Sequence, residues 1–181
     1  MAKKNPARTQ ATRQKIMDCY WSLLEKTSES RVTATQVVQA AGINRSTFYE
    51  YFDSAEAVRE AIEHDVLAYL EAQVAQLLSK STGEEVVIQT ALQILQEKGR
   101  YIAFLYGNGG SSTFTERAKN QIMLLLAGTL GTSDPIDAYR FEFVAAGVLA
   151  AYSLWFRNQQ NIPLEILAPR LRAMADGALG S

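Results

Sequence analysis

The sequence predicts an all-α protein, because apolar residues recur at helical spacing along most of its 181 residues. No segment alternates apolar and polar residues for long enough to indicate a convincing strand. Glycine and proline signals then divide the chain, with Gly42 at a helix end and Asp134-Pro135 at a helix start. We therefore expect about nine helices, arranged as a small N-terminal head, a long connector helix and a C-terminal helical bundle.

The first helix is expected to begin near Thr9 or Thr12. Ile16 and Tyr20 lie four residues apart and start its buried stripe. Cys19 is the only cysteine and has no histidine close to it in the sequence, so we interpret it as a packing residue. A single cysteine excludes an internal disulfide and favours a reducing, cytoplasmic location.

Residues 33–52 carry the clearest motif of the chain. Thr33 followed by Gln36 fits a capping box that opens a short helix, and Gly42 fits a left-handed residue that ends it. Asn44 is a good N-cap for a second short helix. Two short helices joined by a tight turn that contains glycine form the helix-turn-helix pattern.

The second helix of this motif has one apolar side and one polar side. Phe48 and Phe52 lie four residues apart and are expected to point inward. The side chains left to point outward can donate hydrogen bonds or carry positive charge, as base edges and phosphates require. They are Arg45, Ser46, Thr47, Tyr49 and Tyr51.

The run Ala41-Gly42-Ile43, followed by residues 46–52 (STFYEYF), resembles the DNA-binding domain of the TetR (tetracycline repressor) family. The resemblance covers roughly residues 10–60 and implies a regulator, expected to be a repressor, that binds a palindromic double-stranded DNA operator as a homodimer. Together with the chemistry of the side chains, it assigns phosphate contacts to Thr33 and Thr35. Base reading falls to Arg45, Ser46 and Thr47, and contacts to phosphate or thymine methyls to Tyr49 and Tyr51.

Charge is divided unevenly along the chain. Residues 1–51 contain 8 basic and 4 acidic residues, whereas residues 52–181 contain 10 basic and 15 acidic residues. A basic first third beside an acidic remainder is typical of a DNA-binding head on a body that does not bind DNA. Lys3, Lys4 and Arg8 belong to a stretch, residues 1–9, that we read either as a basic arm following the DNA or as a plain disordered terminus.

After the motif, Asp53 followed by Glu56 indicates a cap for a long connector helix that reaches about Ser79. We therefore expect a DNA-binding domain over residues 1–52 and a helical ligand-binding and dimerisation domain over residues 53–181. Ala55 stands where the TetR family commonly has a lysine, so the resemblance implies one missing contact to phosphate. Tyr51 stands where histidine is common, and both side chains can donate to phosphate.

The remaining helices are expected over residues 84–98, 100–106, 115–130, 136–158 and 163–174. Gly99 should close the first of these, and residues 107–112 should form a flexible loop. The helix over residues 136–158 is apolar around most of its circumference, so it must be buried on more than one side.

A dimer interface is expected on the last two long helices, as the resemblance implies. Its predicted centre is Phe143, Gly147, Ala150, Leu154 and Leu171. The alternative is that the helix over residues 136–158 is only the core of the monomer. The resemblance also implies a pocket for a small-molecule effector, which aromatic and sulfur-containing side chains of the body can line. These are Tyr101, Phe104, Tyr106, Met123, Tyr139, Tyr152 and Trp155, and the alternatives are a packed core and regulation without a ligand.

Other classes of protein fit the sequence less well. With one histidine and one cysteine far apart, no nucleophile–base pair and no metal cluster can be argued, so we expect neither an enzyme nor a cofactor or metal site. A helical adaptor for protein partners would leave the charge division and the polar second helix unexplained. The longest apolar run, residues 122–127, falls far short of the ~20 residues of a membrane span, and the N-terminus lacks a signal-peptide core.

Overall fold

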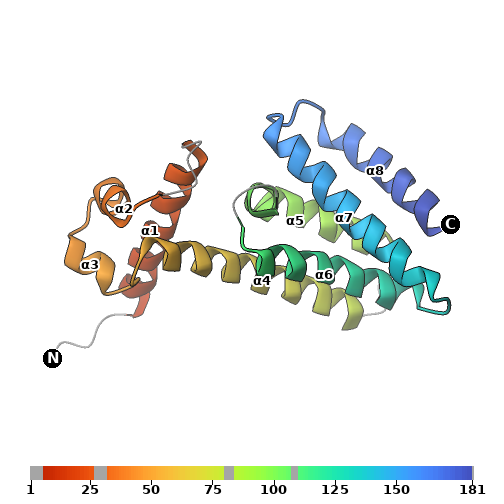
Figure 1. The fold of residues 1–181 in the computed structure, drawn as a ribbon, viewed down its shortest axis with the longest axis horizontal. Coiled ribbons are helices and arrows are strands. Elements are labelled where there is room, and N and C mark those ends of the chain that lie inside the picture. The colour runs from red at the N-terminus through yellow and green to blue at the C-terminus, as the bar shows by residue number, and fades with distance from the viewer. Residues whose placement is uncertain (1–5, 27–31, 80–83, 107–109, 181) are drawn as a thin grey trace. The chain divides into compact units, whose positions relative to one another are not determined.

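The computed structural model describes residues 6–26, 32–79, 84–106 and 110–180. Every regular element in these ranges is a helix, so the prediction of an all-α fold is confirmed (Figure 1). The described residues form α1 (Pro6–Lys26), α2 (Ala34–Ala41), α3 (Arg45–Tyr49), α4 (Ala55–Ser79), α5 (Glu84–Phe104), α6 (Ser112–Leu130), α7 (Ile136–Arg157) and α8 (Leu164–Leu179).

The chain divides into two compact units, Met1–Asp65 and Val66–Ser181. The division falls inside α4, so this helix contributes its first turns to one unit and its later turns to the other. We call the first unit the head and the second unit the body. The functional boundary between residues 52 and 53 stays a prediction.

The head is a small helical domain in which α1 packs against α2 and α2 packs against α3 (Figure 1). Ile16 of α1, Val37 of α2 and Phe48 of α3 are each fully buried, so all three helices contribute side chains to its core. Burying three large apolar side chains in this way supplies several kcal/mol of the roughly 5–15 kcal/mol that stabilises a small domain. The core therefore holds α2 and α3 in a defined arrangement.

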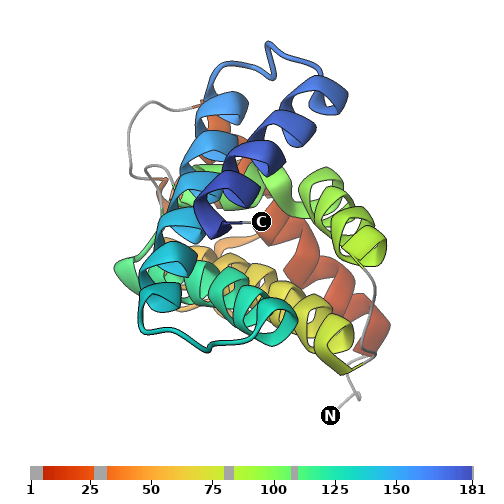
Figure 2. The same cartoon turned by 90° about the vertical axis from the view of Figure 1, so that its right-hand side faces the viewer.

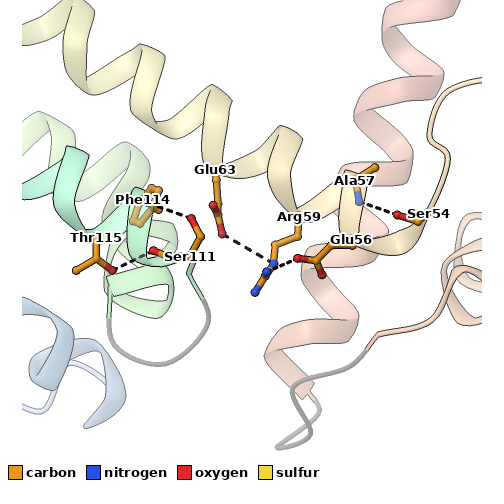
Figure 3. Close-up of polar contacts among 8 residues, drawn as sticks. All are labelled: Ser54, Glu56, Ala57, Arg59, Glu63, Ser111, Phe114 and Thr115. Carbon is orange, nitrogen blue, oxygen red and sulfur yellow. Dashed lines mark hydrogen bonds and ion pairs between the residues drawn. The ribbon is translucent and has the colours of Figure 1, made fainter.

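The first helix and the connector helix start differently from the expectations. The first helix begins at Pro6, ahead of Thr9, because proline fits the first turn of a helix, where its missing amide hydrogen is not needed. At the start of α4 the capping oxygen is that of Ser54 and not of Asp53, since Ala57 N–H donates to Ser54 Oγ over 3.0 Å (Figure 3).

The body is built around α7, which packs against α5, α6 and α8. Figures 1 and 2 both show α8 lying alongside α7. Ser111 caps α6 by accepting a hydrogen bond from Phe114 N–H over 3.0 Å (Figure 3). Asp134 Oδ1 accepts from Ile136 N–H over 2.9 Å, which supports the predicted start of α7. The last helix continues five residues beyond the expected end at Met174 and stops at Leu179.

The predicted break at Gly99 is wrong, because α5 runs without interruption through this residue to Phe104. Gly99 is buried, and a methyl group built on it would lie 2.7 Å from Phe156 Cζ of α7. The glycine therefore allows two helices to approach closely, and it does not end a helix. The first half of the expected loop, residues 107–109, lies outside the described residues, and Ser112 already belongs to α6.

None of the described helices has the length and apolar character needed to cross a membrane.

Candidate nucleic-acid interface

The capping box at the start of α2 forms as predicted. Thr33 has an extended backbone, its N–H donates to Gln36 Oε1 over 2.8 Å, and its Oγ1 accepts from Gln36 N–H over 3.4 Å. At the other end, Gly42 has φ +58°, which confirms the predicted left-handed residue. Ile43 N–H then donates back to Val38 O over 3.3 Å. Both ends of α2 are thus fixed by short-range chemistry.

Phe48 anchors α3, a helix of only 5 residues. Its ring is fully buried and meets the Tyr49 ring edge-on, with 5.3 Å between centroids and 88° between planes. The Phe52 ring lies 6.2 Å from that of Phe48. Asn44 has the extended backbone of an N-cap but makes no capping hydrogen bond with its side chain. Aromatic packing, rather than capping, therefore holds this helix in place.

The predicted DNA contacts lie on or beside α2 and α3 of the head. Three of them on α3 are exposed, namely Arg45, Ser46 and Tyr49. Thr33 and Thr35 at the start of α2 are exposed as well, and Thr47 and Tyr51 are half-buried. Lys3 and Lys4 lie outside the described residues. Arg8 lies in α1, and its side chain lies outside the described part of the structure.

Arg45 and Tyr49 interact with each other through two contacts. The Arg45 guanidinium carbon lies 5.5 Å from the centroid of the Tyr49 ring, and Arg45 Nη2 donates to Tyr49 Oη over 3.3 Å. The two residues are four positions apart, the spacing at which side chains of a helix meet. The cation is therefore held beside a ring that is itself packed on buried Phe48.

Charged residues around this motif are paired within the head. Arg13 of α1 lies over the Phe52 ring at 5.5 Å and forms an ion pair with Asp65 over 3.5 Å. On α4, Arg59 is paired with Glu56, and its Nε lies 3.9 Å from buried Glu63 (Figure 3). Because Tyr20 is buried, its pKa rises from 10.0 to about 12, an effect that nearby Arg59 partly opposes. The core tyrosine is therefore neutral at physiological pH.

The predicted dimer residues on α7 form one exposed stripe of the body. Phe143 is 70% exposed and Leu154 is 51% exposed, and Gly147 and Ala150 between them are exposed too. Leu171 of α8 is half-buried. Further apolar residues that the sequence reasoning missed or assigned elsewhere are exposed, namely Ile136 and Tyr139 of α7 and Ile166 and Met174 of α8. On α7, the spacing of three and four from Ile136 through Tyr139 to Phe143 could have indicated the first two.

The seven predicted pocket residues differ widely in burial, and a pocket lined by them stays a prediction. Trp155 is buried and donates from Nε1 to Ile162 O over 2.7 Å, so its indole holds the turn between α7 and α8. Tyr152 packs on Trp155, and burial raises the pKa of its hydroxyl. Tyr139 is 74% exposed. Tyr101, Phe104, Tyr106 and Met123 are half-buried.

An open groove of about 750 Å³ lies in the body along α6, α7 and the turn between them. Met123 is the one predicted pocket residue that lines it. The other lining residues are Asn120, Leu124, Ala127, Thr132, Ser133, Asp134, Pro135, Ala138 and Phe141. Sequence spacing did not indicate this groove, because its walls come from two helices and a turn.

The known proteins to which this chain is similar are named as regulators or activators, and their sequence identity to it is low. No family model matches the chain. The chain is 24% identical over 141 residues to an HTH-type transcriptional regulator of Mycobacterium tuberculosis, found in two strains, with 74% of this chain and 70% of the relative covered. A solved TetR transcriptional regulator from Streptococcus agalactiae 2603V is 20% identical with a TM-score of 0.65, covering 93% of this chain and 96% of that one.

Two further solved structures share the fold. The fatty acid degradation regulator FadR from Bacillus halodurans has a TM-score of 0.68 at 14% identity, covering 99% of this chain and 97% of that one. The dihydroxyacetone kinase operon activator DhaS has a TM-score of 0.59 at 17% identity, covering 93% and 96%. This chain thus has the fold of TetR-type transcriptional regulators, which confirms the resemblance read from residues 41–52. These relatives are named as regulators or activators, and none of them is named as an enzyme.

Proposed function

We propose that the protein is a sequence-specific DNA-binding transcriptional regulator that inserts α3 into the major groove. The observation that carries this proposal is the contrast within α3, where Phe48 is fully buried while Arg45, Ser46 and Tyr49 are exposed. A short helix that is anchored by one aromatic side chain and presents cationic and hydrogen-bonding groups matches the recognition helix of a helix-turn-helix.

Different side chains of the head have different proposed roles. Arg45, Ser46 and Thr47 read base edges, and Tyr49 and Tyr51 contact phosphate or thymine methyls. Thr35 at the start of α2 is exposed and donates to phosphate. Thr33 is exposed too, and its hydroxyl, which donates to Gln36 Oε1 over 2.8 Å in the free protein, turns to a phosphate on binding. Lys3 and Lys4 of the basic arm add contacts to the DNA backbone, and Arg8, which lies in the first turn of α1 and not in an arm, adds a further one. Ala55 cannot supply a charged contact at the start of α4.

The regulator acts as a homodimer through the outer face of α7 and α8. None of the side chains of α8 is buried in the single chain, although the helix carries Ile166, Leu171 and Met174. A helix is stable in water mainly through the apolar face that it buries, so α8 needs a further surface to cover it. Two copies of the same stripe are self-complementary about a two-fold axis, and such a dimer places two recognition helices about 34 Å apart on a palindrome.

Two finer points rest on the resemblance alone. Repression is expected from it, but one relative of the same fold is named as an operon activator. Release by a small-molecule effector is likewise expected from it. The groove along α6 and α7 has the volume of a small-molecule site, yet it is open and contains only Met123 of the seven predicted residues.

DNA binding is tested by selecting duplexes from a pool with a random central segment and measuring affinity by fluorescence anisotropy. We expect binding that weakens steeply with salt and a selected consensus that is palindromic. Arg45→Ala should weaken binding to the consensus by about 1–3 kcal/mol if Arg45 reads guanine.

Arg117→Ala is the matched control, because Arg117 is an exposed arginine of the body that pairs with Glu71. It removes the same charge and should leave affinity within about 0.5 kcal/mol. Equal losses for Arg45→Ala on the consensus and on random DNA would identify Arg45 as a phosphate contact. A wild-type protein that selects no sequence and shows no salt dependence would refute the proposed function.

A further inference from the structure

The contact between Arg45 and Tyr49 bears on how bases are read. Arg45 Nη2 donates to Tyr49 Oη over 3.3 Å, and its guanidinium carbon lies 5.5 Å from the centre of the same ring. Both side chains are exposed, so neither contact is forced by burial of the arginine. An exposed arginine would otherwise sample many rotamers. The tyrosine therefore restricts the directions in which the guanidinium can point.

The Tyr49 ring is itself restrained from below. It meets Phe48 edge-on at 5.3 Å, and Phe48 is fully buried in the core of the head. A chain of contacts thus runs from the core through Phe48 and Tyr49 to the guanidinium of Arg45. Reading guanine requires the planar guanidinium to lie in the plane of the base and to donate to both O6 and N7. Orientation, as well as charge, then decides how well Arg45 discriminates.

We propose that Tyr49 is a positioning residue that holds the Arg45 guanidinium in the orientation for reading a guanine, and so sets the base preference of the protein at that position. The inference rests on the proposed function and deepens it. Preorganising a flexible side chain lowers the entropy lost on binding the correct base. A guanidinium freed from Tyr49 still attracts DNA by its charge, but it donates hydrogen bonds to neighbouring phosphates and bases almost equally.

A positioning role of Tyr49 and a phosphate contact by Tyr49 predict different effects of its removal on DNA binding. Loss of a phosphate contact weakens binding to all sequences alike, because phosphates carry no sequence information. Loss of a positioning contact lowers the preference for guanine at one base pair and leaves the preferences at other positions unchanged. Tyr49→Ala and Tyr49→Phe separate the two roles, because the second variant keeps the ring and removes only the hydroxyl.

The first measurement compares binding to two duplexes. One is the duplex that the wild type selects from a random pool. The other is the same duplex with adenine in place of guanine at the position where Arg45→Ala abolishes the preference for guanine. The wild type should prefer guanine by about tenfold or more. Tyr49→Ala should reduce the preference for guanine over adenine to about threefold or less, and Tyr49→Phe should show a preference between those of the wild type and Tyr49→Ala. In the Arg45→Ala background, Tyr49→Ala should cause no further loss of preference. Thr35→Ala, a proposed phosphate contact, should weaken binding to both duplexes by the same factor.

The second measurement needs no DNA. Nitrogen-15 relaxation of Arg45 Nε in the free protein should show an ordered side chain in the wild type and a mobile one in Tyr49→Ala. A thermal unfolding scan checks that the head of each variant remains folded, which the 44% exposure of Tyr49 leads us to expect.

The outcomes separate the inference from the function on which it rests. Wild-type preference for guanine retained in Tyr49→Ala, or an Arg45 side chain equally mobile in both proteins, overturns the positioning role alone. A wild type without salt-dependent, sequence-selective binding overturns the proposed function and the positioning role together.

Discussion

The head and the body differ in the large side chains that they leave exposed. In the head, Phe48 is fully buried, and the side chains exposed beside it on α3 are Arg45, Ser46 and Tyr49, each of which carries a hydrogen-bonding group. In the body, Phe143 is 70% exposed and Tyr139 is 74% exposed, on the helix that also forms the centre of the core. The exposed groups of α3 can thus form hydrogen bonds and ionic contacts with a charged ligand. The body leaves large apolar side chains exposed to solvent.

This difference indicates two kinds of partner. Exposed polar groups on a rigid support favour a ligand that is recognised by hydrogen bonds and charge. A row of large exposed apolar residues on one face marks a surface for protein association, because water disfavours such a patch on a monomer. The same contrast predicts how identical substitutions behave in the two units.

The largest expected effect is that of Phe48→Ala. Removing a fully buried ring from the small core of the head should lower its free energy of unfolding by about 3–5 kcal/mol. Amide hydrogen exchange should then show lost protection in α1 to α3 and preserved protection in α5 to α7. Phe143→Ala is the matched control and should leave the protection of both units unchanged. Equal loss of protection in head and body after Phe48→Ala would show that the two units do not unfold separately.

Phe143→Glu should separate the subunits without unfolding them. A charge placed in the middle of the exposed stripe would be desolvated in the dimer, so we expect dimerisation to weaken by about 2 kcal/mol or more. Sedimentation equilibrium should show a dissociation constant raised by roughly thirtyfold or more. Glu142→Gln on the adjacent position removes a charge without entering the stripe and serves as control. A wild type that is monomeric at micromolar concentration would remove the basis for this interface.

Alkaline pH should destabilise the head through Tyr20. Its pKa in the folded state is about 12 against 10.0 ordinarily, because burial disfavours the tyrosinate. A pKa difference of this size corresponds to about 3 kcal/mol at most, so this stabilisation is fully present below pH 10 and is lost as the pH rises toward 12. Urea unfolding across this range should show the decline, and Tyr20→Phe should reduce it. A decline of the same size in Tyr20→Phe would assign the effect to other groups, such as Tyr69 in the body.

The smallest expected effect concerns the turn between α7 and α8. Gln159 and Gln160 have φ values of 53° and 56°, in the left-handed region where a side chain is unfavourable. Gln159→Gly should therefore raise the melting temperature of the body, with a gain of about 1 kcal/mol or less. Gln159→Ala retains a Cβ and should give no gain. If both variants melt alike, backbone strain at this turn is negligible.

The local elements of this protein follow from contacts between residues that are close in the sequence. Thr33, Gln36 and Gly42 act through bonds to neighbours a few residues away, so their roles could be read from spacing. The inward direction of Phe48 and the outward direction of Arg45 followed from helical periodicity for the same reason. These short-range rules were sufficient to predict an all-α fold and a helix-turn-helix whose polar side chains point outward.

The exposure of apolar residues and the close approach of helices depend on packing between segments that are far apart in the sequence. Gly99 resembles a helix end in the sequence, but its missing side chain leaves space for Phe156 on a helix that is distant in the sequence. Tyr139 was predicted as a pocket residue, and its side chain is exposed, as is that of Phe143 one helical turn later. Trp155 was predicted as a pocket residue too, and its indole donates a hydrogen bond to the turn between α7 and α8. Packing between distant segments sets these outcomes. Apolar residues recur at the same helical spacing whether they face the core of their own chain, a cavity or a second copy of the chain.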